Sequence, residues 1–219
     1  MTQRALIIVA KEPVPGQTKT RLCPPFTLKS AAAFYRCLLL DSLALISRVE
    51  TTDHVIAYAP PDARGYFTRL APKCFSLVAQ VGNNLGERLA NALDHHFGQG
   101  YDRVVIMNSD GPTLPLAHLE DAFTGLDRAD VTLGPGHDGG YYLIGMKQLY
   151  RELFEGIDWS TERVVSQTLA ACRRLGLAVH HLPEWYDVDL AADLERLRHD
   201  LEAKPELAPH TWEFLQELG

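Results

Sequence analysis

Short apolar runs alternate with longer amphipathic segments along the chain. The runs are continuous and rich in β-branched residues, which is typical of strands that are buried on both faces. Strands are predicted at 4–10, 54–59, 75–80, 103–110, 129–135, 139–146 and 178–183. The segments between them have helical spacing, and helices are predicted at 28–49, 60–71, 82–97, 114–127, 161–176, 191–203 and 206–218.

This alternation predicts an α/β fold, with a mostly parallel sheet covered by helices on both faces. The runs at 129–135 and 139–146 follow each other so closely that a hairpin or a bent antiparallel unit is expected there. In such sheets, ligands bind beyond the carboxyl ends of the strands, where the loops leave for the next helix. The unusual residues of this chain fall in those loops.

Composition narrows the class of protein. A length of 219 residues suits one domain spanning 1–219, and 46% hydrophobic with 22% charged residues is ordinary for a globular protein. The net charge of -7 argues against a nucleic-acid partner, which would need a basic stripe. The 4 cysteines form no CxxC pair, and no apolar run reaches the length of a signal peptide or a membrane span. We therefore expect a cytoplasmic protein without a membrane partner; its oligomeric state is left open.

The first candidate loop is "VAKEPVPGQTKTRL", which follows the first strand. It places Lys11, Lys19 and Arg21 around Gly16 and lacks the first glycine of a Walker P-loop. Cations at this place suit a diphosphate or triphosphate, and a glycine allows the backbone to approach it closely. A solvated surface loop is the alternative interpretation.

Acidic residues stand at two later strand ends. In "VVIMNSDGPTL", Asp110 is the last residue of the predicted fourth strand. Its carboxylate could hold Mg²⁺, or the residue could form a turn or a helix cap. In "WYDVDLAADL", Asp187 and Asp189 lie two residues apart, so in an extended segment both carboxylates would face one side, as a divalent cation requires. Alternatively, Asp189 caps the helix that starts at Leu190.

The stretch "LGPGHDGGYYLIG" is rich in glycine. Gly139 and Gly140 could form a hairpin turn only, or could let a substrate lie flat on the backbone. His137 and Asp138 suggest metal or acid-base chemistry, with His137 the weaker candidate because adjacent side chains in a strand face opposite ways.

Taken in order, "KEPVPGQTKTRL", "NNLGERL", "NSDGPTL", "GPGHDGGYYLIG", "WST" and "DVDLAADL" resemble the motifs of the DUF2064 family, bacterial proteins also called rSAM/selenodomain-associated transferase 1. The resemblance covers Lys11 to Leu194. It implies a Rossmann-like GT-A fold, a nucleotide or nucleotide-sugar donor, a small-molecule acceptor and Mg²⁺ or Mn²⁺. Relatives of the family include molybdenum-cofactor cytidylyltransferases and 2-phospholactate guanylyltransferases.

The resemblance also implies roles for single residues. The phosphate-binding loop corresponds to Lys11, Gly16, Lys19 and Arg21; the metal ligands to Asp110, Asp187 and Asp189; the catalytic carboxylates to Asp110, Asp138 and Asp189; and the substrate contacts to Gly139, Gly140, Asn84, Arg88 and Trp159. This chain has Asn108 where the family commonly has a glycine, and a side chain there would narrow the pocket.

Some of these positions have a structural interpretation as well. Glu87 and Arg88 could contact the donor or form an exposed ion pair at a helix start. Trp159, Ser160 and Thr161 could border the acceptor, while Ser160 could equally cap the next helix.

Three functions agree with these motifs. The first, slightly favoured, is glycosyl transfer from a nucleotide-diphospho-sugar. The second is nucleotidylyl transfer from a nucleoside triphosphate to a phosphorylated small molecule, with release of pyrophosphate. The third is a non-catalytic nucleotide-binding protein that kept the fold.

Overall fold

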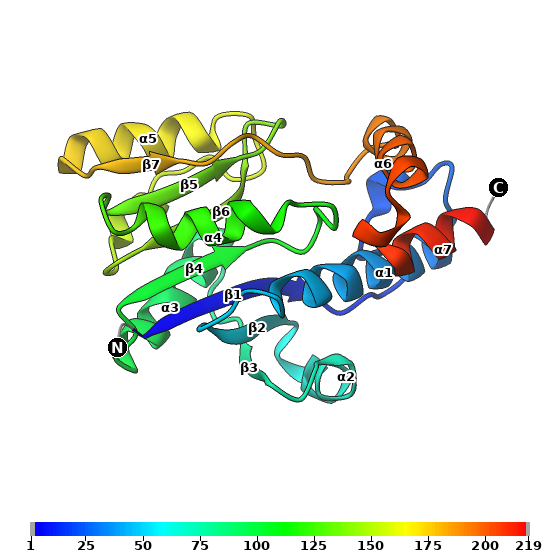
Figure 1. Ribbon diagram of the computed structural model, residues 1–219, viewed down its shortest axis with the longest axis horizontal. Helices are drawn as coiled ribbons and strands as arrows, with labels where there is room; N and C mark the ends of the chain where they lie inside the picture. The colour runs from blue at the N-terminus through cyan, green and yellow to red at the C-terminus, as the bar shows by residue number, and fades with distance from the viewer. Residues whose placement is uncertain (1–2, 218–219) are drawn as a thin grey trace.

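Seven strands form one mixed sheet in the order β3-β2-β1-β4-β6-β5-β7. The computed structural model describes residues 3–217, and Figure 1 shows the course of the chain. Among the strands of residues 3–217, β6 alone runs antiparallel to its neighbours, β4 and β5. The strands are β1 (Arg4–Lys11), β2 (Asp53–Ala59), β3 (Phe75–Ala79), β4 (Arg103–Met107), β5 (Val131–Pro135), β6 (Tyr141–Met146) and β7 (Val179–His181). The predicted mostly parallel sheet is therefore confirmed.

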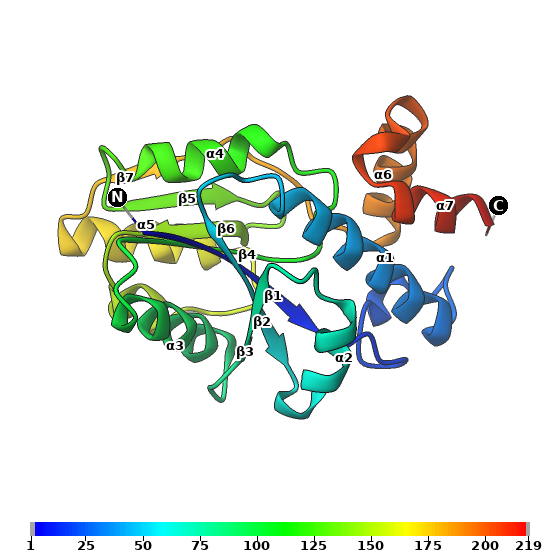
Figure 2. The same ribbon diagram turned by 60° about the horizontal axis from the view of Figure 1, so that its bottom comes forward.

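Helices cover both faces of this sheet. The helices of the described residues are α1 (Leu28–Ile46), α2 (Arg64–Leu70), α3 (Leu85–Gly98), α4 (Leu116–Gly125), α5 (Val164–Leu175), α6 (Ala191–Ala203) and α7 (Pro209–Glu217). Short 3₁₀ turns are η1 (Thr20–Leu22), η2 (Pro61–Ala63), η3 (Arg151–Phe154) and η4 (Pro205–Leu207). Figure 2 shows α3 and α4 on opposite sides of the strands.

Alternation along the strands divides the core into two layers. Ile8 of β1 faces the layer that contains Phe67 of α2 and Phe123 of α4. The adjacent residue Ile7 faces the other layer, with Leu93 of α3. Each strand buries both faces because successive side chains point to opposite sides, which explains the continuous apolar runs in the sequence.

The C-terminal helices α6 and α7 do not lie on the sheet. They pack against the first half of α1 in a third cluster, in which Phe34, Leu38, Leu197 and Leu215 are buried. Figure 1 shows these helices together at one end of the molecule, beyond the carboxyl ends of β1 and β4. The segment that joins β7 to α6 must therefore cross that edge of the sheet.

Every predicted strand and helix has a counterpart among the described residues, and the differences lie at the ends. Strand β4 stops at Met107 rather than at residue 110, so Asp110 lies in the turn. The helix predicted from 161 begins at Val164. The turns η1 and η3 were not predicted because such short turns leave no periodic pattern. Leu218, the predicted last residue of the final helix, lies outside the described residues.

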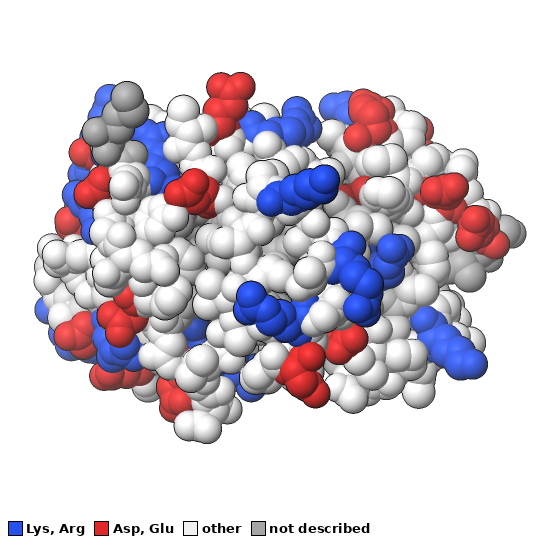
Figure 3. All heavy atoms as spheres, turned by 90° about the horizontal axis from the view of Figure 1, so that it is seen from below, with Lys and Arg blue, Asp and Glu red and all other residues white. Residues whose placement is uncertain are grey.

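The surface carries charges of both signs. Figure 3 shows one face on which Lys and Arg side chains are separated by uncharged residues and by Asp and Glu. Among residues 3–217, no helix combines the length and the apolar character that a membrane crossing needs.

Candidate functional site

A buried lysine joins two of the predicted acidic residues. The Nζ atom of Lys19 lies 2.7 Å from Oδ1 of Asp110 and 2.6 Å from Oδ1 of Asp189. Lys19 comes from the loop after β1, Asp110 from the turn after β4, and Asp189 from the segment between β7 and α6. The tertiary fold thus brings the three motifs to one edge of the sheet, as the strand-end rule predicted.

The ammonium group of Lys19 is held away from water. Its side chain is only 6% exposed. Burial alone would lower the Lys19 pKa, but the two carboxylates outweigh this effect and raise the pKa above its ordinary value. The backbone of Lys19 is left-handed, with φ 50° and ψ 35°, a conformation that costs a non-glycine residue roughly 1–2 kcal/mol. Lys19 therefore stays positively charged. Its unfavourable backbone conformation is held in place by the surrounding fold.

Asp187 is the third carboxylate at this edge of the sheet, and it is half-buried. Its Oδ2 accepts a hydrogen bond of 2.6 Å from Nδ2 of Asn108, while its Oδ1 is buried without a partner in the described residues. Burial, reinforced by the negative charge of Asp110, raises the pKa of Asp187 to about 8. A buried carboxylate oxygen without a donor is unusual, and such atoms often mark the place of an ion or water.

Asp193 stabilises the start of α6. Its Oδ2 accepts the backbone N–H groups of Asp189 at 3.0 Å and of Leu190 at 2.7 Å. The alternative that Asp189 caps this helix is therefore wrong, because Asp193 has that role and the Asp189 carboxylate faces Lys19 instead. The backbone N–H of Val188 donates to the carbonyl of Asp110 at 3.0 Å, which fixes the segment against the β4 turn.

Tyr35 holds two loops of the site together by hydrogen bonds. The hydroxyl of Tyr35, in α1, accepts the backbone N–H of Lys11 at 3.1 Å and forms a 2.8 Å hydrogen bond with Ser109. Burial is the main cause that raises the Tyr35 pKa to about 12, so the phenol is neutral. Tyr35 thereby links the first loop to the turn that carries Asp110.

A cavity of about 500 Å³ opens beside the ends of β1, β2 and β3. Lys11 and Arg88 contribute positive charge to its wall and Glu12 contributes negative charge, and Thr18, the neighbour of Lys19, belongs to the same wall. Gln80 spans the strand ends, because its Nε2 donates to the carbonyl of Ala57 at 2.7 Å and to that of Ala10 at 3.3 Å. The volume suits a small-molecule ligand.

The other cations of the first loop are placed differently. Arg21 is exposed and does not line the cavity. Gly16 has a φ of +80°, and an added Cβ would meet only Leu28 at 3.8 Å, so the turn conformation explains this glycine better than close packing does. The sequence thus grouped three cations that the structure separates into Lys11 at the cavity, Lys19 among carboxylates and Arg21 on the surface.

The turn between β5 and β6 contains the predicted substrate-side residues. Oδ1 of Asp138 accepts the backbone N–H of Gly140 at 2.9 Å. Gly139 has a φ of +83°, and its carbonyl accepts the N–H of Val165 at 2.9 Å. A Cβ at Gly139 would lie 2.2 Å from the carbonyl oxygen of Glu162, so only glycine fits here. The turn is a hairpin, and it is also fixed against the start of α5.

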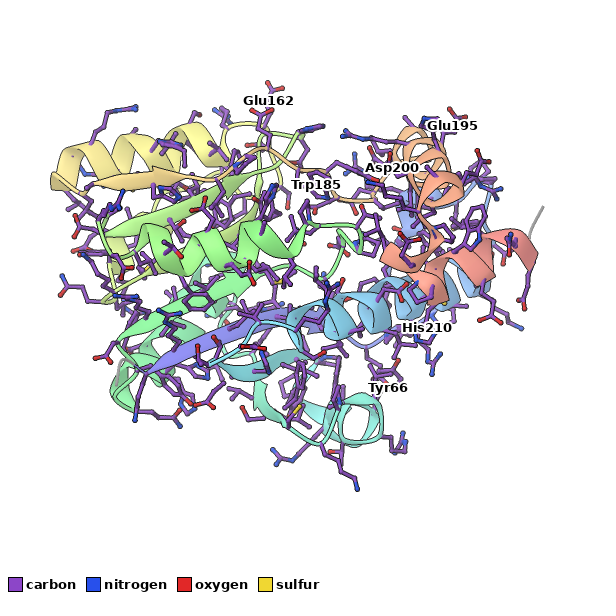
Figure 4. All side chains as sticks on the ribbon, viewed as in Figure 1. Tyr66, Glu162, Trp185, Glu195, Asp200 and His210 are labelled. Atoms are coloured by element: carbon purple, nitrogen blue, oxygen red, sulfur yellow. The ribbon has the colours of Figure 1, made fainter. Side chains whose placement is uncertain are left out.

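A bridge connects this turn to α6. Arg196 lies 3.9 Å over the ring of Tyr186 and places a guanidinium nitrogen 2.8 Å from Nδ1 of His137. The Tyr186 hydroxyl in turn donates to Asp200 at 2.6 Å. Figure 4 shows Asp200 on α6 and Trp185 in the crossing segment. His137 therefore contacts α6 rather than the acidic cluster.

The structure gives local roles to the remaining predicted contacts. Asn84 caps α3, since its Oδ1 accepts the N–H of Glu87 at 2.9 Å. Nε of Arg88 donates to the carbonyl of Gly82, and no ion pair with Glu87 is found within residues 3–217. Trp159 packs edge-on against Tyr141, with ring centroids 6.2 Å apart.

The alternative that Ser160 caps the next helix is wrong. Ser160 has a φ of 65°, and the residue that flanks α5 is Arg163, without a side-chain cap. Thr161 bonds within this loop, because its hydroxyl donates to the carbonyl of Asp158 at 2.7 Å.

Sequence reasoning missed several residues that shape the site. Asp193 could have been found from its position three residues after Leu190, because an acidic residue at the third position of a helix commonly bonds back to the N-cap backbone. Tyr35 and Gln80 left no signal, because their partners are distant in sequence.

The donor set fits a divalent cation. Three carboxylates of suitable chemistry approach this edge, and the unpartnered Oδ1 of Asp187 is an oxygen that such an ion would satisfy. Within residues 3–217, no three His, Cys, Asp or Glu side chains already form a metal-binding group. In this arrangement the ammonium group of Lys19 lies between Asp110 and Asp189.

Comparisons with solved structures support the fold. A protein from Desulfovibrio desulfuricans G20, provisionally named a nucleotide-diphospho-sugar transferase, is 36% identical, with a TM-score of 0.91 over 99% of this chain and 95% of its own. CMP:2-keto-3-deoxy-manno-octonic acid synthetase, solved with CTP, is 12% identical, with a TM-score of 0.59 over 93% of this chain and 100% of its own.

A 4-diphosphocytidyl-2C-methyl-D-erythritol synthase from Anaerococcus prevotii DSM 20548 is 9% identical, with a TM-score of 0.62 over 91% of this chain and 96% of its own. These two distant likenesses concern the fold alone, and they confirm the predicted α/β architecture. None of the curated protein sequences compared with the chain matches it significantly.

The family is shown by sequence as well as by structure. The profile of DUF2064, described as an uncharacterized protein conserved in bacteria, matches residues 42–161, which is more than half of the chain. Together with the 36% identity over 99% of the chain, this match confirms the resemblance seen in the motifs. The protein belongs to the DUF2064 family.

Proposed function

We propose that the protein is a metal-dependent transferase that moves a sugar from a nucleotide-diphospho-sugar donor to a small-molecule acceptor. One observation carries this proposal. A carboxylate cluster with an unpartnered buried oxygen, on Asp187, lies at the same sheet edge as a cavity of about 500 Å³ whose wall includes Lys11 and Arg88. The relative that is 36% identical, provisionally named a nucleotide-diphospho-sugar transferase, supports the choice of donor.

The cavity is the place that we assign to the nucleotide. Lys11 and Arg88 supply the positive charge that a diphosphate requires. Pro60 and Gln80 form the wall that we assign to the base. Both hydrogens of the Gln80 amide group point to backbone carbonyls, which leaves its Oε1 to accept a hydrogen bond from the base.

Asp110, Asp187 and Asp189 are the residues that would hold Mg²⁺ or Mn²⁺. When bound, the ion would supply positive charge that stabilises the diphosphate leaving group. The chain would contribute the position of each oxygen: Asn108 fixes Asp187, and Asp193 fixes the backbone of Asp189.

Asp138 is our candidate for the general base. Its Oδ1 is used by Gly140, whereas no hydrogen bond from residues 3–217 reaches its Oδ2. This oxygen would take the proton of an acceptor hydroxyl as that hydroxyl bonds to the anomeric carbon and the nucleoside diphosphate leaves. Gly139 keeps the turn in place beside α5. Gly140 and Trp159 remain predicted substrate contacts.

A second candidate function is nucleotidylyl transfer. Lys19 favours it, because one more cation near the phosphates would suit a triphosphate, which has more charge than a nucleoside diphosphate. In this reaction, an acceptor phosphate would attack the α-phosphate, and pyrophosphate would leave.

Product analysis separates these functions. The purified protein is incubated with Mg²⁺ or Mn²⁺ and panels of nucleoside triphosphates and nucleotide-sugars, and thermal shift and released products are followed. We expect stabilisation by nucleotide-sugars and release of nucleoside diphosphate. Stabilisation by triphosphates alone, with pyrophosphate release, would contradict glycosyl transfer. Metal-independent binding without turnover would contradict both transferase functions and would leave a nucleotide-binding protein.

A further inference from the structure

We propose that Lys19 is an internal counter-ion that excludes the divalent cation until a nucleotide binds, so that metal and nucleotide bind cooperatively. This inference rests on the proposed function and adds to it an order of binding. The geometry that carries it is the position of one ammonium group, 2.7 Å and 2.6 Å from the oxygens of Asp110 and Asp189.

Lys19 occupies the oxygens that the ion needs. Both contacts use Oδ1, one on Asp110 and one on Asp189, and the side chain between them is 6% exposed. A divalent cation that bound the same oxygens would lie within a few ångströms of a buried positive charge, where repulsion is strong because little water screens it. Metal and ammonium therefore compete for this position.

The third carboxylate of the site, Asp187, is not paired with Lys19. Asp187 has one oxygen bound to Asn108 and one oxygen without a hydrogen-bond partner in the described residues. Lys19 balances two of the three carboxylates and reaches neither oxygen of Asp187. The cluster thus retains one ligand for an ion while two others are blocked.

A nucleotide would provide Lys19 with an alternative partner. Gln17 and Thr18, immediately before Lys19, line the cavity that also contains Lys11 and Arg88, so phosphates bound there would lie next to the loop that carries the lysine. A buried ammonium group is costly without a partner, and a phosphate oxygen replaces a carboxylate well. The left-handed backbone of Lys19 is a strained conformation that a shift of the loop would relieve.

This exchange makes metal and nucleotide mutually dependent. If nucleotide binding moves Lys19 away from Asp110 and Asp189, it increases the affinity for the ion. By thermodynamic reciprocity, the ion increases the affinity for the nucleotide by the same factor. A protein that works this way binds little metal on its own.

The test measures binding of Mn²⁺ by electron paramagnetic resonance, with and without each of the four common ribonucleoside diphosphates. For the wild type, we expect weak binding of Mn²⁺ alone and at least about tenfold tighter binding when a nucleotide is present. Lys19→Met should bind Mn²⁺ alone at least about tenfold more tightly than the wild type, and nucleotide should add little. Lys19→Arg keeps the charge and should keep the exclusion.

Lys29→Met is the matched control, because Lys29 is exposed in the first turn of α1 and its replacement changes the net charge equally. It should bind Mn²⁺ like the wild type. Melting curves show whether the variants fold, and the wild-type comparison with and without nucleotide stands even if Lys19→Met does not fold.

The outcomes distinguish the inference from the proposed function. If a nucleotide binds but the wild type binds Mn²⁺ equally well without it, the exclusion by Lys19 is overturned while a metal-dependent transferase stands. Tighter Mn²⁺ binding by Lys29→Met, equal to that of Lys19→Met, would overturn it too. If Mn²⁺ binds under none of these conditions, metal dependence itself fails, and the inference fails with it.

Discussion

Asn108 donates a hydrogen bond of 2.6 Å to Asp187, a residue that is 79 positions later in the chain. The resemblance to the DUF2064 motifs predicts that the Asn108 side chain narrows the pocket, and this stays a prediction. In the structure the Asn108 side chain binds a predicted metal ligand. Asn108 is thus a residue that orients Asp187.

Replacing Asn108 with alanine should destabilise the protein. The substitution leaves both oxygens of the buried Asp187 carboxyl without a donor, at an expected cost of about 1–3 kcal/mol in the free energy of unfolding. Urea unfolding at neutral pH measures it. Asn83→Ala is the control, since Asn83 is exposed and bonds only to Glu87; a change of about 0.5 kcal/mol or less is expected there. Equal effects in both variants would contradict the role of Asn108.

Stability should fall as the pH rises through about 8 in the metal-free protein. The pKa of Asp187 is raised from 3.8 to about 8 in the folded state, so the folded protein holds this proton more tightly than the unfolded chain. The resulting stabilisation of the folded state is fully present below about pH 4 and is lost progressively as the pH rises to about 8. Asp187→Asn lacks the titrating group, and its free energy of unfolding should depend less on pH in this window. Parallel profiles for wild type and variant would refute the assignment.

Asp110→Asn and Asp189→Asn should each lower activity by at least about 100-fold, because each removes a charged oxygen from the proposed metal site. Either variant leaves Lys19 with one carboxylate, so we expect a loss of only about 1 kcal/mol in stability. The double variant leaves a buried ammonium group unpaired and should lose about 3–5 kcal/mol. Activity assays and urea unfolding of all three variants test this non-additivity. Large stability losses in the single variants would mean that the carboxylates are chiefly structural.

Asp193→Ala should weaken metal binding, although Asp193 is not itself a proposed metal ligand. The variant loses the acceptor for the N–H groups of Asp189 and Leu190, which should cost about 1 kcal/mol and displace Asp189. We expect reduced Mn²⁺ affinity in the presence of nucleotide, together with a lower melting temperature. Glu195→Ala, an exposed change on the same helix, should leave both unchanged (Figure 4). Unaltered Mn²⁺ affinity in Asp193→Ala would show that the cap does not position Asp189.

Gly139→Ala should destabilise the turn between β5 and β6. The new Cβ would lie 2.2 Å from the carbonyl oxygen of Glu162, at a residue with a φ of +83°. We expect a loss of about 1–3 kcal/mol in stability and a lower activity, because the turn and Asp138 would shift. Gly98→Ala is the matched control, since nothing lies within 4 Å of its added Cβ. The interpretation fails if both variants melt at the wild-type temperature.

The sequence by itself determined the layered fold. Continuous apolar runs such as that of β1 require burial on both faces, and the amphipathic segments between them require a surface to cover, so few architectures other than a helix-covered parallel sheet remain. It also determined that Asp110 and Lys11 lie at strand ends, and therefore at one edge, because parallel strands share their direction.

Only the tertiary structure decided which of these side chains meet. Lys19 and Arg21 are equivalent in the sequence pattern, yet the Lys19 side chain is buried between carboxylates and Arg21 is exposed. Asp193 rather than Asp189 caps α6, a choice that local spacing left open. Contacts such as Asn108 with Asp187 join residues far apart in the chain, and their formation depends on the packing of the whole molecule rather than on any local propensity.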